Sequence, residues 1–276
     1  HSNYKASSVR ISELYKIKEI GFGHKIMVND VEFNNFYYKY NDKIILNDIH
    51  FRLSMGDFVL IKGPTGSGKT TLFKALTKKI RFDEMTILIN GKNISKYNFD
   101  TLRRSIIYVE QDIKLFDDTI LENITLGCKL NLRHNFKMVL EEEFRKKGID
   151  YNILVDSANS NLSGGEIALI KVAQVLNNDF DMVIFDETTN SLDTRLEKMV
   201  LNAIKKDYKD KIVVFISHRN YNTYLFNKII KIKDKKGRII YDKTKTKRIK
   251  KIKGRRFKWL GNHWYYSRRN FCRRNI

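Results

Sequence analysis

The chain has 276 residues, 42% of them hydrophobic and 30% charged, with a formal net charge of +22. This length and composition suit one large α/β domain or two small ones, with enough apolar residues for a sizeable core. The two cysteines, Cys128 and Cys272, exclude a disulfide framework or a cysteine-rich metal site and favour a reducing compartment. No stretch approaches the roughly 20 apolar residues of a membrane span, and no signal peptide is predicted at the N-terminus.

The positive charge is concentrated toward the C-terminus. Residues 228–276 contain 20 Lys or Arg and two acids, Asp234 and Asp242, so they carry +18 and leave +4 for the first 227 residues. We therefore expect a near-neutral body and a separate basic tail, residues 243–276. Basic residues together with Trp259 and Trp264 are typical of segments that contact anionic lipid or nucleic acid. A disordered or divergent extension is the alternative, and we favour it.

The apolar pattern predicts strands that alternate with helices. Residues 1–27 are polar and predict a linker, with a short helix at 8–17. Strands and turns are expected over 28–62, and 58–61 is apolar throughout, which suits a buried parallel strand. Further strands are predicted at 87–89, 106–109, 182–185 and 212–216, and helices at 70–79 and 196–206. Residues 119–178 are mostly helical. This alternation predicts a parallel α/β sheet, with a helical subdomain inserted at about 112–176 in a domain that spans 28–242.

A phosphate-binding loop is predicted between the strand at 58–61 and the helix after it. Residues 63–70, GPTGSGKT, fit the pattern G-x-x-x-x-G-K-[ST] in the required context. Its glycines permit backbone angles that turn N–H groups toward phosphate oxygens, and the N-terminus of the following helix adds positive potential. Lys69 is expected to reach the β- and γ-phosphates, and Thr70 to offer its hydroxyl to Mg²⁺. The predicted nucleotide-binding residues are Gly63, Pro64, Thr65, Gly66, Ser67, Gly68, Lys69, Thr70 and Thr71.

The apolar strand at 182–185 ends in two acids. An acid at this end of a parallel strand points toward the ligand edge of the sheet. Asp186 is expected to hold Mg²⁺, mostly through its water shell. Glu187 is expected to polarise the attacking water as a general base, a role worth ~10²–10⁴ in rate. Two acids in a solvated loop are common, so the pairing with the phosphate loop is what favours the functional interpretation.

At residues 162–166 the sequence LSGGE resembles the LSGGQ signature of the ATP-binding-cassette ATPases, with Glu166 in the last position. Four more family motifs follow the family's order, and the resemblance covers about residues 28–240. They are carried by Tyr40, which matches the aromatic that stacks on adenine, Gln111, which matches the loop glutamine, Asp193 in the D-loop SLD at 191–193, and His218, which matches the switch histidine.

The resemblance implies ATP and Mg²⁺ as cofactors and an active ATPase. Its catalytic residues would be Glu187, His218 and Gln111, and its metal ligands Thr70, Gln111 and Asp186. In the family, the signature binds the γ-phosphate of ATP held by the opposite subunit. A second nucleotide-binding domain is therefore an expected partner, and the residues that would contact ATP across that interface include Ser163, Gly164, Gly165, Glu166 and Asp193.

Other details resemble exporter domains. Residues 115–124, LFDDTILENI, match the stretch after the loop glutamine, and residues 7–13, SSVRISE, match the link from a last membrane helix. The resemblance implies a P-loop NTPase core with a parallel sheet, an antiparallel β subdomain and the inserted α-helical subdomain. It also implies transmembrane domains as partners and a place on the cytoplasmic face of the cell membrane. Abundant Ile, Lys and Asn suggest a peptide exporter.

Two alternatives belong to other classes of protein. One is a soluble cassette ATPase that acts on nucleic acid, and the other is a nucleotide-gated interaction module with little turnover. Glu166 and the apolar run at 167–170 depart from the family's usual residues, which bears on the energetics of the signature helix and leaves the phosphate loop intact.

Overall fold

The computed structural model describes residues 25–110, 114–156, 161–219 and 222–243, and the strand backbone at 258–260 and 263–265. The chain divides into two compact units, His1–Tyr241 and Asp242–Ile276. In the described part of the second unit, β11 (Lys258–Leu260) pairs with β12 (His263–Tyr265) as an antiparallel hairpin. The predicted helix at 8–17 and Gln111 lie outside the described residues.

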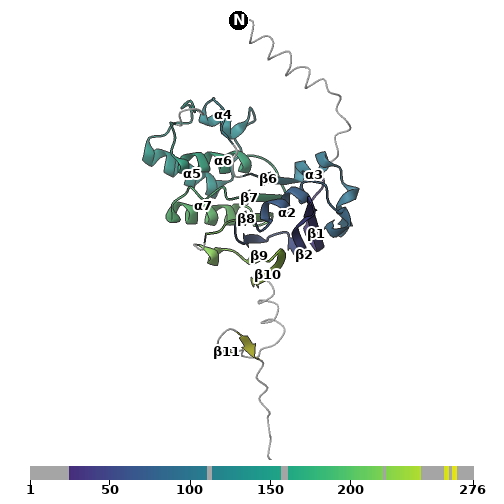
Figure 1. Cartoon of the computed structure of the whole chain (residues 1–276). Helices are drawn as coiled ribbons and strands as arrows, with labels where there is room; N and C mark the ends of the chain where they lie inside the picture. The colour runs from purple at the N-terminus through teal and green to yellow at the C-terminus, as the bar shows by residue number, and fades with distance from the viewer. Residues whose placement is uncertain are drawn as a thin grey trace, which may run out of the picture. The chain divides into compact units, whose positions relative to one another are not determined.

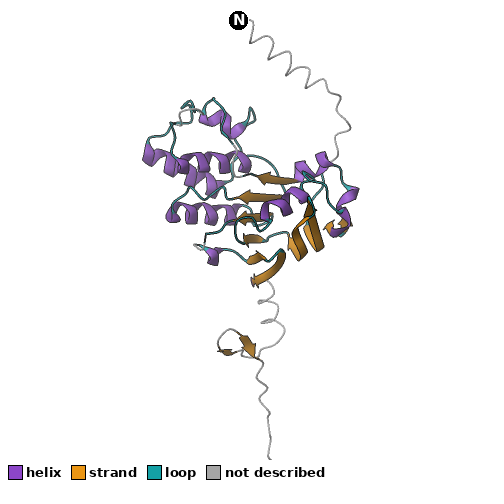
Figure 2. Cartoon of the chain, viewed as in Figure 1, coloured by secondary structure: helices purple, strands orange, loops and turns teal. Residues whose placement is uncertain are grey.

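The first unit contains a mixed sheet and two groups of helices (Figure 1; Figure 2). Its strands are β1 (Asp30–Tyr40), β2 (Lys43–Ser54), β3 (Phe58–Lys62), β4 (Ile87–Ile89), β5 (Lys92–Asn93), β6 (Ile106–Val109), β7 (Met182–Asp186), β8 (Ile212–Ile216), β9 (Lys228–Lys233) and β10 (Lys236–Asp242). Its helices are α2 (Lys69–Leu76), α3 (Phe99–Ser105), α4 (Ile120–Thr125), α5 (His134–Lys147), α6 (Gly164–Leu176) and α7 (Thr194–Asp207), with short 3₁₀ helices η1 (Glu84–Thr86), η2 (Ile94–Lys96) and η3 (Thr223–Leu225).

The ten strands follow the order β5-β4-β1-β2-β10-β9-β3-β8-β7-β6. Strands β9, β3, β8, β7 and β6 pair in parallel, whereas β1, β2, β4 and β5 pair antiparallel with one another, and β2 also pairs in parallel with β10. The predicted combination of a parallel α/β core with an antiparallel β part is therefore confirmed. Because the parallel strands share one direction, the loops that follow β3, β6, β7 and β8 all leave from the same edge of the sheet.

Alternate residues of the central strands face two different cores. Phe58 and Leu60 of β3 join the core that contains residues of α4, α5, α6 and α7. Val59 and Ile61 join the core made with α2, α3, β1 and β2. Since neighbouring side chains on a strand point to opposite faces, helices must cover both faces, and this explains why the parallel strands are apolar throughout.

The helix after the phosphate-binding loop is shorter than the sequence pattern predicts. Helix α2 ends at Leu76 rather than at 79, because Lys78 has φ of 53°, a left-handed conformation that cannot continue the helix. The charge count over residues 228–276 also includes β9 and β10, which precede the predicted tail at 243–276, and β9 lies inside the sheet between β10 and β3. Lys228 is buried, and its ammonium lies 2.5 Å from a carboxylate oxygen of Asp57. The charge of Lys228 is thus part of the core structure.

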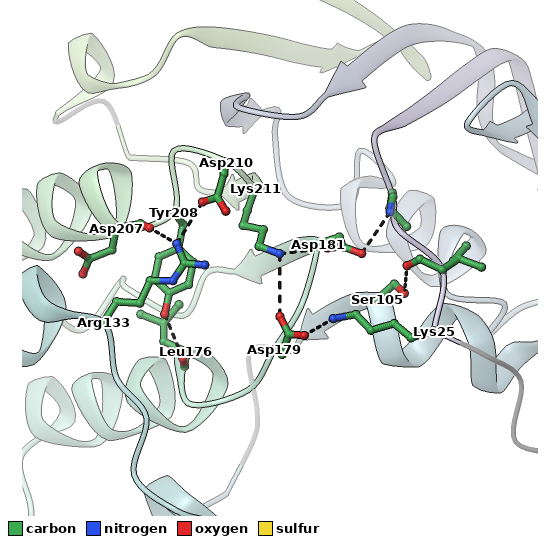
Figure 3. Close-up of polar contacts among 12 residues, drawn as sticks. Lys25, Ser105, Arg133, Leu176, Asp179, Asp181, Asp207, Tyr208, Asp210 and Lys211 are labelled. Carbon is green, nitrogen blue, oxygen red and sulfur yellow. Dashed lines mark hydrogen bonds and ion pairs between the residues drawn. The ribbon is translucent and has the colours of Figure 1, made fainter.

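A polar cluster lies where β7 and β8 begin, at the edge of the sheet opposite to the loops that follow β3, β6, β7 and β8 (Figure 3). The ammonium of Lys211 lies 3.0 Å from Asp181 and 3.9 Å from Asp179. Asp181 also accepts a hydrogen bond from the backbone N–H of Val28, and Asp179 pairs with Lys25. These contacts fasten the segment that leads into β1 to the edge of the sheet farthest from the phosphate loop.

Candidate nucleotide site

Residues 63–70, called here the phosphate loop, connect β3 to α2 as predicted. A Cβ atom at Gly63 would lie 2.3 Å from the carbonyl oxygen of Ile232 in β9, so only glycine allows this close approach. Gly68 occupies the N-cap of α2 with φ of 90°, a left-handed conformation that suits glycine. Within the described residues, no side chain caps α2. The N-terminus of this helix therefore keeps backbone donors for an anion.

The side chain of Lys69 is buried and curls back over the phosphate loop. Its Nζ donates hydrogen bonds to the carbonyl oxygens of Gly63 (3.0 Å) and Pro64 (2.9 Å). Beside it, the hydroxyl of Ser67 is buried and has no hydrogen-bond partner in the described structure. A buried, unsatisfied hydroxyl is costly, and phosphate oxygens would supply the missing partner. The loop therefore fits a bound nucleotide.

Asp186 receives hydrogen bonds from two hydroxyl groups at the end of β7. Its Oδ2 atom accepts from Thr70 Oγ1 at 2.7 Å and from Tyr108 OH at 2.7 Å. Burial, followed by the hydrogen bond and negative charge of Asp186, raises the pKa of Tyr108 well above its usual value, so the phenol stays a donor. The structure brings Thr70 and Asp186 together as predicted. Tyr108 is an additional site residue that the sequence pattern did not predict.

Glu187 lies in a small polar group at the same edge. Its backbone has φ of 53°, and its N–H donates to the carbonyl oxygen of Ile216 in β8 at 3.0 Å. One carboxylate oxygen accepts from the Asn190 amide at 3.0 Å, and the other lies 3.5 Å from Nδ1 of His218. The side chain of His218 is 59% exposed, so a ligand bound at the surface can contact its ring. Glu187 and His218, two of the three predicted catalytic residues, are thus neighbours.

Residues 162–166, called here the signature turn, begin helix α6. Ser163 is the N-cap, and Ser163 and Glu166 form a reciprocal capping box. Gly164 approaches Ser191 of the D-loop, since a Cβ atom there would lie 3.5 Å from the Ser191 side chain. Asp193 caps α7 by accepting hydrogen bonds from the N–H groups of Arg195 and Leu196, both at 2.9 Å.

The site residues fall into separate groups. Among the described residues, the side-chain hydrogen bonds and ion pairs of 163–166 stay within the signature turn or run to Lys147, and none reaches the phosphate loop. Tyr40 ends β1, and the residue is 61% exposed. No group of three or more His, Cys, Asp or Glu side chains that could hold a metal occurs in the described part of the chain. A metal bound by Thr70 and Asp186 would therefore need further ligands, such as nucleotide phosphates.

The fold and these contacts define a P-loop nucleotide-binding domain. The family model described as ABC transporter matches residues 46–190, more than half of the chain. The chain therefore belongs to the ABC transporter family and contains its ATP-binding ATPase domain, as the resemblance implied.

Three named relatives show the same similarity. The chain is 35% identical over 68% of its length to an export ATP-binding/permease protein of Rickettsia typhi, of which it covers 34%. It is 30% identical over 77% of its length to an ATP-dependent lipid A-core flippase of Colwellia psychrerythraea, of which it covers 37%. It is 33% identical over 69% of its length to the mitochondrial iron-sulfur clusters transporter Atm1 of Kluyveromyces lactis, of which it covers 28%. The chain thus spans about a third of the length of these relatives.

Among solved structures, the fold resembles a bacterial Atm1-family ABC exporter with ATP bound. The TM-score is 0.68 at 24% identity, over 89% of this chain and 46% of that one. Among the described residues, no helix of this chain is both long and apolar enough to cross a membrane.

Proposed function

We propose that this chain is the motor domain of an ABC exporter, in which ATP binding and hydrolysis drive transport across a membrane. The observation that carries the proposal is the convergence of Thr70, Asp186, Glu187 and His218 at the edge of the sheet beside the phosphate loop. Membership of the ABC transporter family and the similarity to proteins named as exporters support the same conclusion.

Residues of the phosphate loop would hold the triphosphate. The backbone donors at the start of α2 and the ammonium of Lys69 are the groups that suit phosphate oxygens, with Thr71 in the first turn of the helix. Tyr40 would stack on the adenine. Thr70, Asp186 and Gln111 would hold Mg²⁺, and the metal's positive charge would, when it is bound, stabilise negative charge that develops on the phosphates.

Glu187 would act as general base toward the attacking water. Its carboxylate is oriented by the Asn190 amide and lies beside His218, an arrangement in which a second group positions the base. His218 would donate a hydrogen bond to the γ-phosphate. Gln111 would help to orient the water. The proton taken from water would pass to the Glu187 carboxylate, which the Asn190 amide already holds in place.

The signature turn would act on ATP bound to a second nucleotide-binding domain. The hydroxyl of Ser163 accepts a hydrogen bond from the Glu166 N–H, which leaves its hydrogen free for a phosphate oxygen. Gly164, Gly165, Glu166 and Asp193 would contribute to the same contact, so that two domains would enclose two ATP molecules in an isologous dimer. Hydrolysis removes the γ-phosphate between them, so the domains separate, and transmembrane domains on the cytoplasmic face of the membrane would use that motion.

For the cargo, we propose only that it is a molecule moved across a membrane. A peptide is the cargo that the composition suggested, and none of the three relatives described above is named for a peptide. Contact of the basic tail with nucleic acid or anionic lipid remains an independent proposal, because family membership concerns the ATP-binding domain alone.

The test compares Glu187→Gln with the unchanged chain and with Lys69→Ala. We expect steady-state ATP turnover to fall by about 10²–10⁴-fold in Glu187→Gln while ATP binding persists, because the base acts only on the water. Lys69→Ala should lose binding as well. Equal loss of binding in both variants would count against Glu187 as the base. Negligible turnover in the unchanged chain would favour the nucleotide-gated module, and salt-dependent DNA binding that disappears with the tail would favour the soluble ATPase.

A further inference from the structure

Glu166 is the position at which the signature turn departs from the family's sequence, and its carboxylate makes two contacts. One oxygen accepts the backbone N–H of Ser163 at 2.9 Å, which completes the capping box. The other oxygen accepts from Nζ of Lys147, the last residue of α5, at 3.0 Å. The side chain of Glu166 is only 13% exposed, so its charge is partly withdrawn from water.

The capping box does not require a negative charge. Either Glu or Gln at this position can accept the Ser163 N–H, so glutamine would complete the cap equally well. The charge of Glu166 is therefore an addition, and it lies beside backbone donors proposed to bind a phosphate. Like charges at a partly buried site repel more strongly than they do in water. Without compensation, Glu166 would oppose the approach of an anion to the signature turn.

Lys147 supplies that compensation from another helix. Its ammonium also lies 3.7 Å from the Glu143 carboxylate, one turn earlier on α5, which helps to hold it in place. The hydrogen bond to Glu166 is the main reason that the pKa of Lys147 is raised. Burial alone would raise the pKa of Glu166, but the hydrogen bonds from Ser163 and Lys147 outweigh burial and lower it. Both members of the pair therefore stay charged at neutral pH.

We propose that Lys147 is a positioning residue for the signature turn, one that neutralises Glu166 so that the turn can accept the γ-phosphate of ATP held by a second copy of this domain. The inference rests on the proposed function, because it assumes the two-domain ATP sandwich. It makes the last turn of α5 part of the recognition of triphosphate across the interface.

The experiment measures ATP-dependent dimerisation of the full chain. The parent carries Glu187→Gln, so that bound ATP persists, and it is compared with Lys147→Met, Glu166→Gln and the double variant. Sedimentation velocity at saturating Mg·ATP gives the protein concentration at which half of the chain is dimeric. We expect Lys147→Met to raise this concentration about fivefold, the upper range for a partly exposed ion pair. In the Glu166→Gln background the same substitution should have no effect.

Two controls separate positioning from folding. Lys147→Arg keeps the charge and should dimerise as the parent does. Lys146→Met removes a neighbouring lysine whose partner is Glu142, and it should also leave dimerisation unchanged. All variants should bind ATP as monomers with the parent's affinity, since the phosphate loop is untouched. Equal effects of Lys147→Met in both backgrounds, or none, would overturn the inference and leave the proposed function standing. A parent that never dimerises with ATP would overturn the sandwich itself, and the inference with it.

Discussion

Asp186 is oriented by hydroxyl groups from two elements, and this makes Tyr108 testable. Tyr108→Phe removes one of two hydrogen bonds to the same carboxylate oxygen while keeping the ring. Because groups that orient a metal ligand typically contribute 10- to 100-fold to metal affinity, we expect the Mg²⁺ concentration for half-maximal ATP binding to rise about tenfold. Isothermal titration at fixed ATP measures this. Tyr97→Phe, whose hydroxyl donates to Ile89 away from the site, is the matched control; identical Mg²⁺ dependence in the two variants would contradict the role of Tyr108.

At the same scale, the sequence predicted the phosphate loop because its residues are contiguous and their spacing encodes the geometry. The pairing of Thr70 with Asp186 could also be predicted, from the rule that parallel strands end at one edge. The contact between Tyr108 and Asp186 could not be predicted, because it depends on which strand lies next to β7, and the local sequence pattern does not determine strand order. The available signal was a hydroxyl near the carboxyl end of an otherwise apolar strand, and it is weak alone.

The elements depend on contacts between residues distant in sequence, and helix α5 is the clearest case. Its N-cap residue, Arg133, makes no capping hydrogen bond; instead Asp207, at the end of α7, accepts from the N–H groups of Asn135 (3.2 Å) and Phe136 (2.8 Å). The Arg133 guanidinium lies 4.4 Å from the centre of the Tyr208 ring, and Tyr208 donates to the carbonyl oxygen of Leu176 (Figure 3). The sequence predicted a helix at 196–206 and a mostly helical stretch at 119–178 that contains α5, but not this cap, because a cap supplied from another helix leaves no local signature.

We expect Asp207→Ala to destabilise the domain by about 1–2 kcal/mol, the usual cost of losing a helix cap. Urea unfolding followed by circular dichroism gives the change in the free energy of unfolding. Asp210→Ala, which removes an exposed ion-pair partner of Arg133, should lower the free energy of unfolding by no more than about 1 kcal/mol. If the two variants were equally stable, Asp207 would be a surface acid with no capping role.

For the molecule as a whole, the rise in positive charge along the chain does not coincide with the division between the two compact units. Basic residues become frequent from Lys228 onward, whereas the compact unit runs on to Tyr241. Alternation within β9 explains the difference: Lys228, Ile230 and Ile232 are buried, whereas Lys231 and Lys233 are exposed. A strand with lysines on its outer face raises the charge count without leaving the sheet, so charge density alone cannot locate a domain boundary.

This distinction predicts opposite outcomes for two changes that each remove positive charge. Lys228→Met leaves the buried carboxylate of Asp57 without its ion pair, and losing one partner of a buried pair costs about 3–5 kcal/mol. Removing residues 244–276 takes away many more charges, yet it leaves β10, which ends at Asp242, complete. We expect Lys228→Met to lower the unfolding temperature by several degrees and the truncation to leave it unchanged, both measured by calorimetry.

Asp57→Asn combined with Lys228→Met should recover part of the loss, because no uncompensated charge remains buried. A truncated chain as unstable as Lys228→Met would show instead that the basic tail supports the fold of the ATP-binding domain.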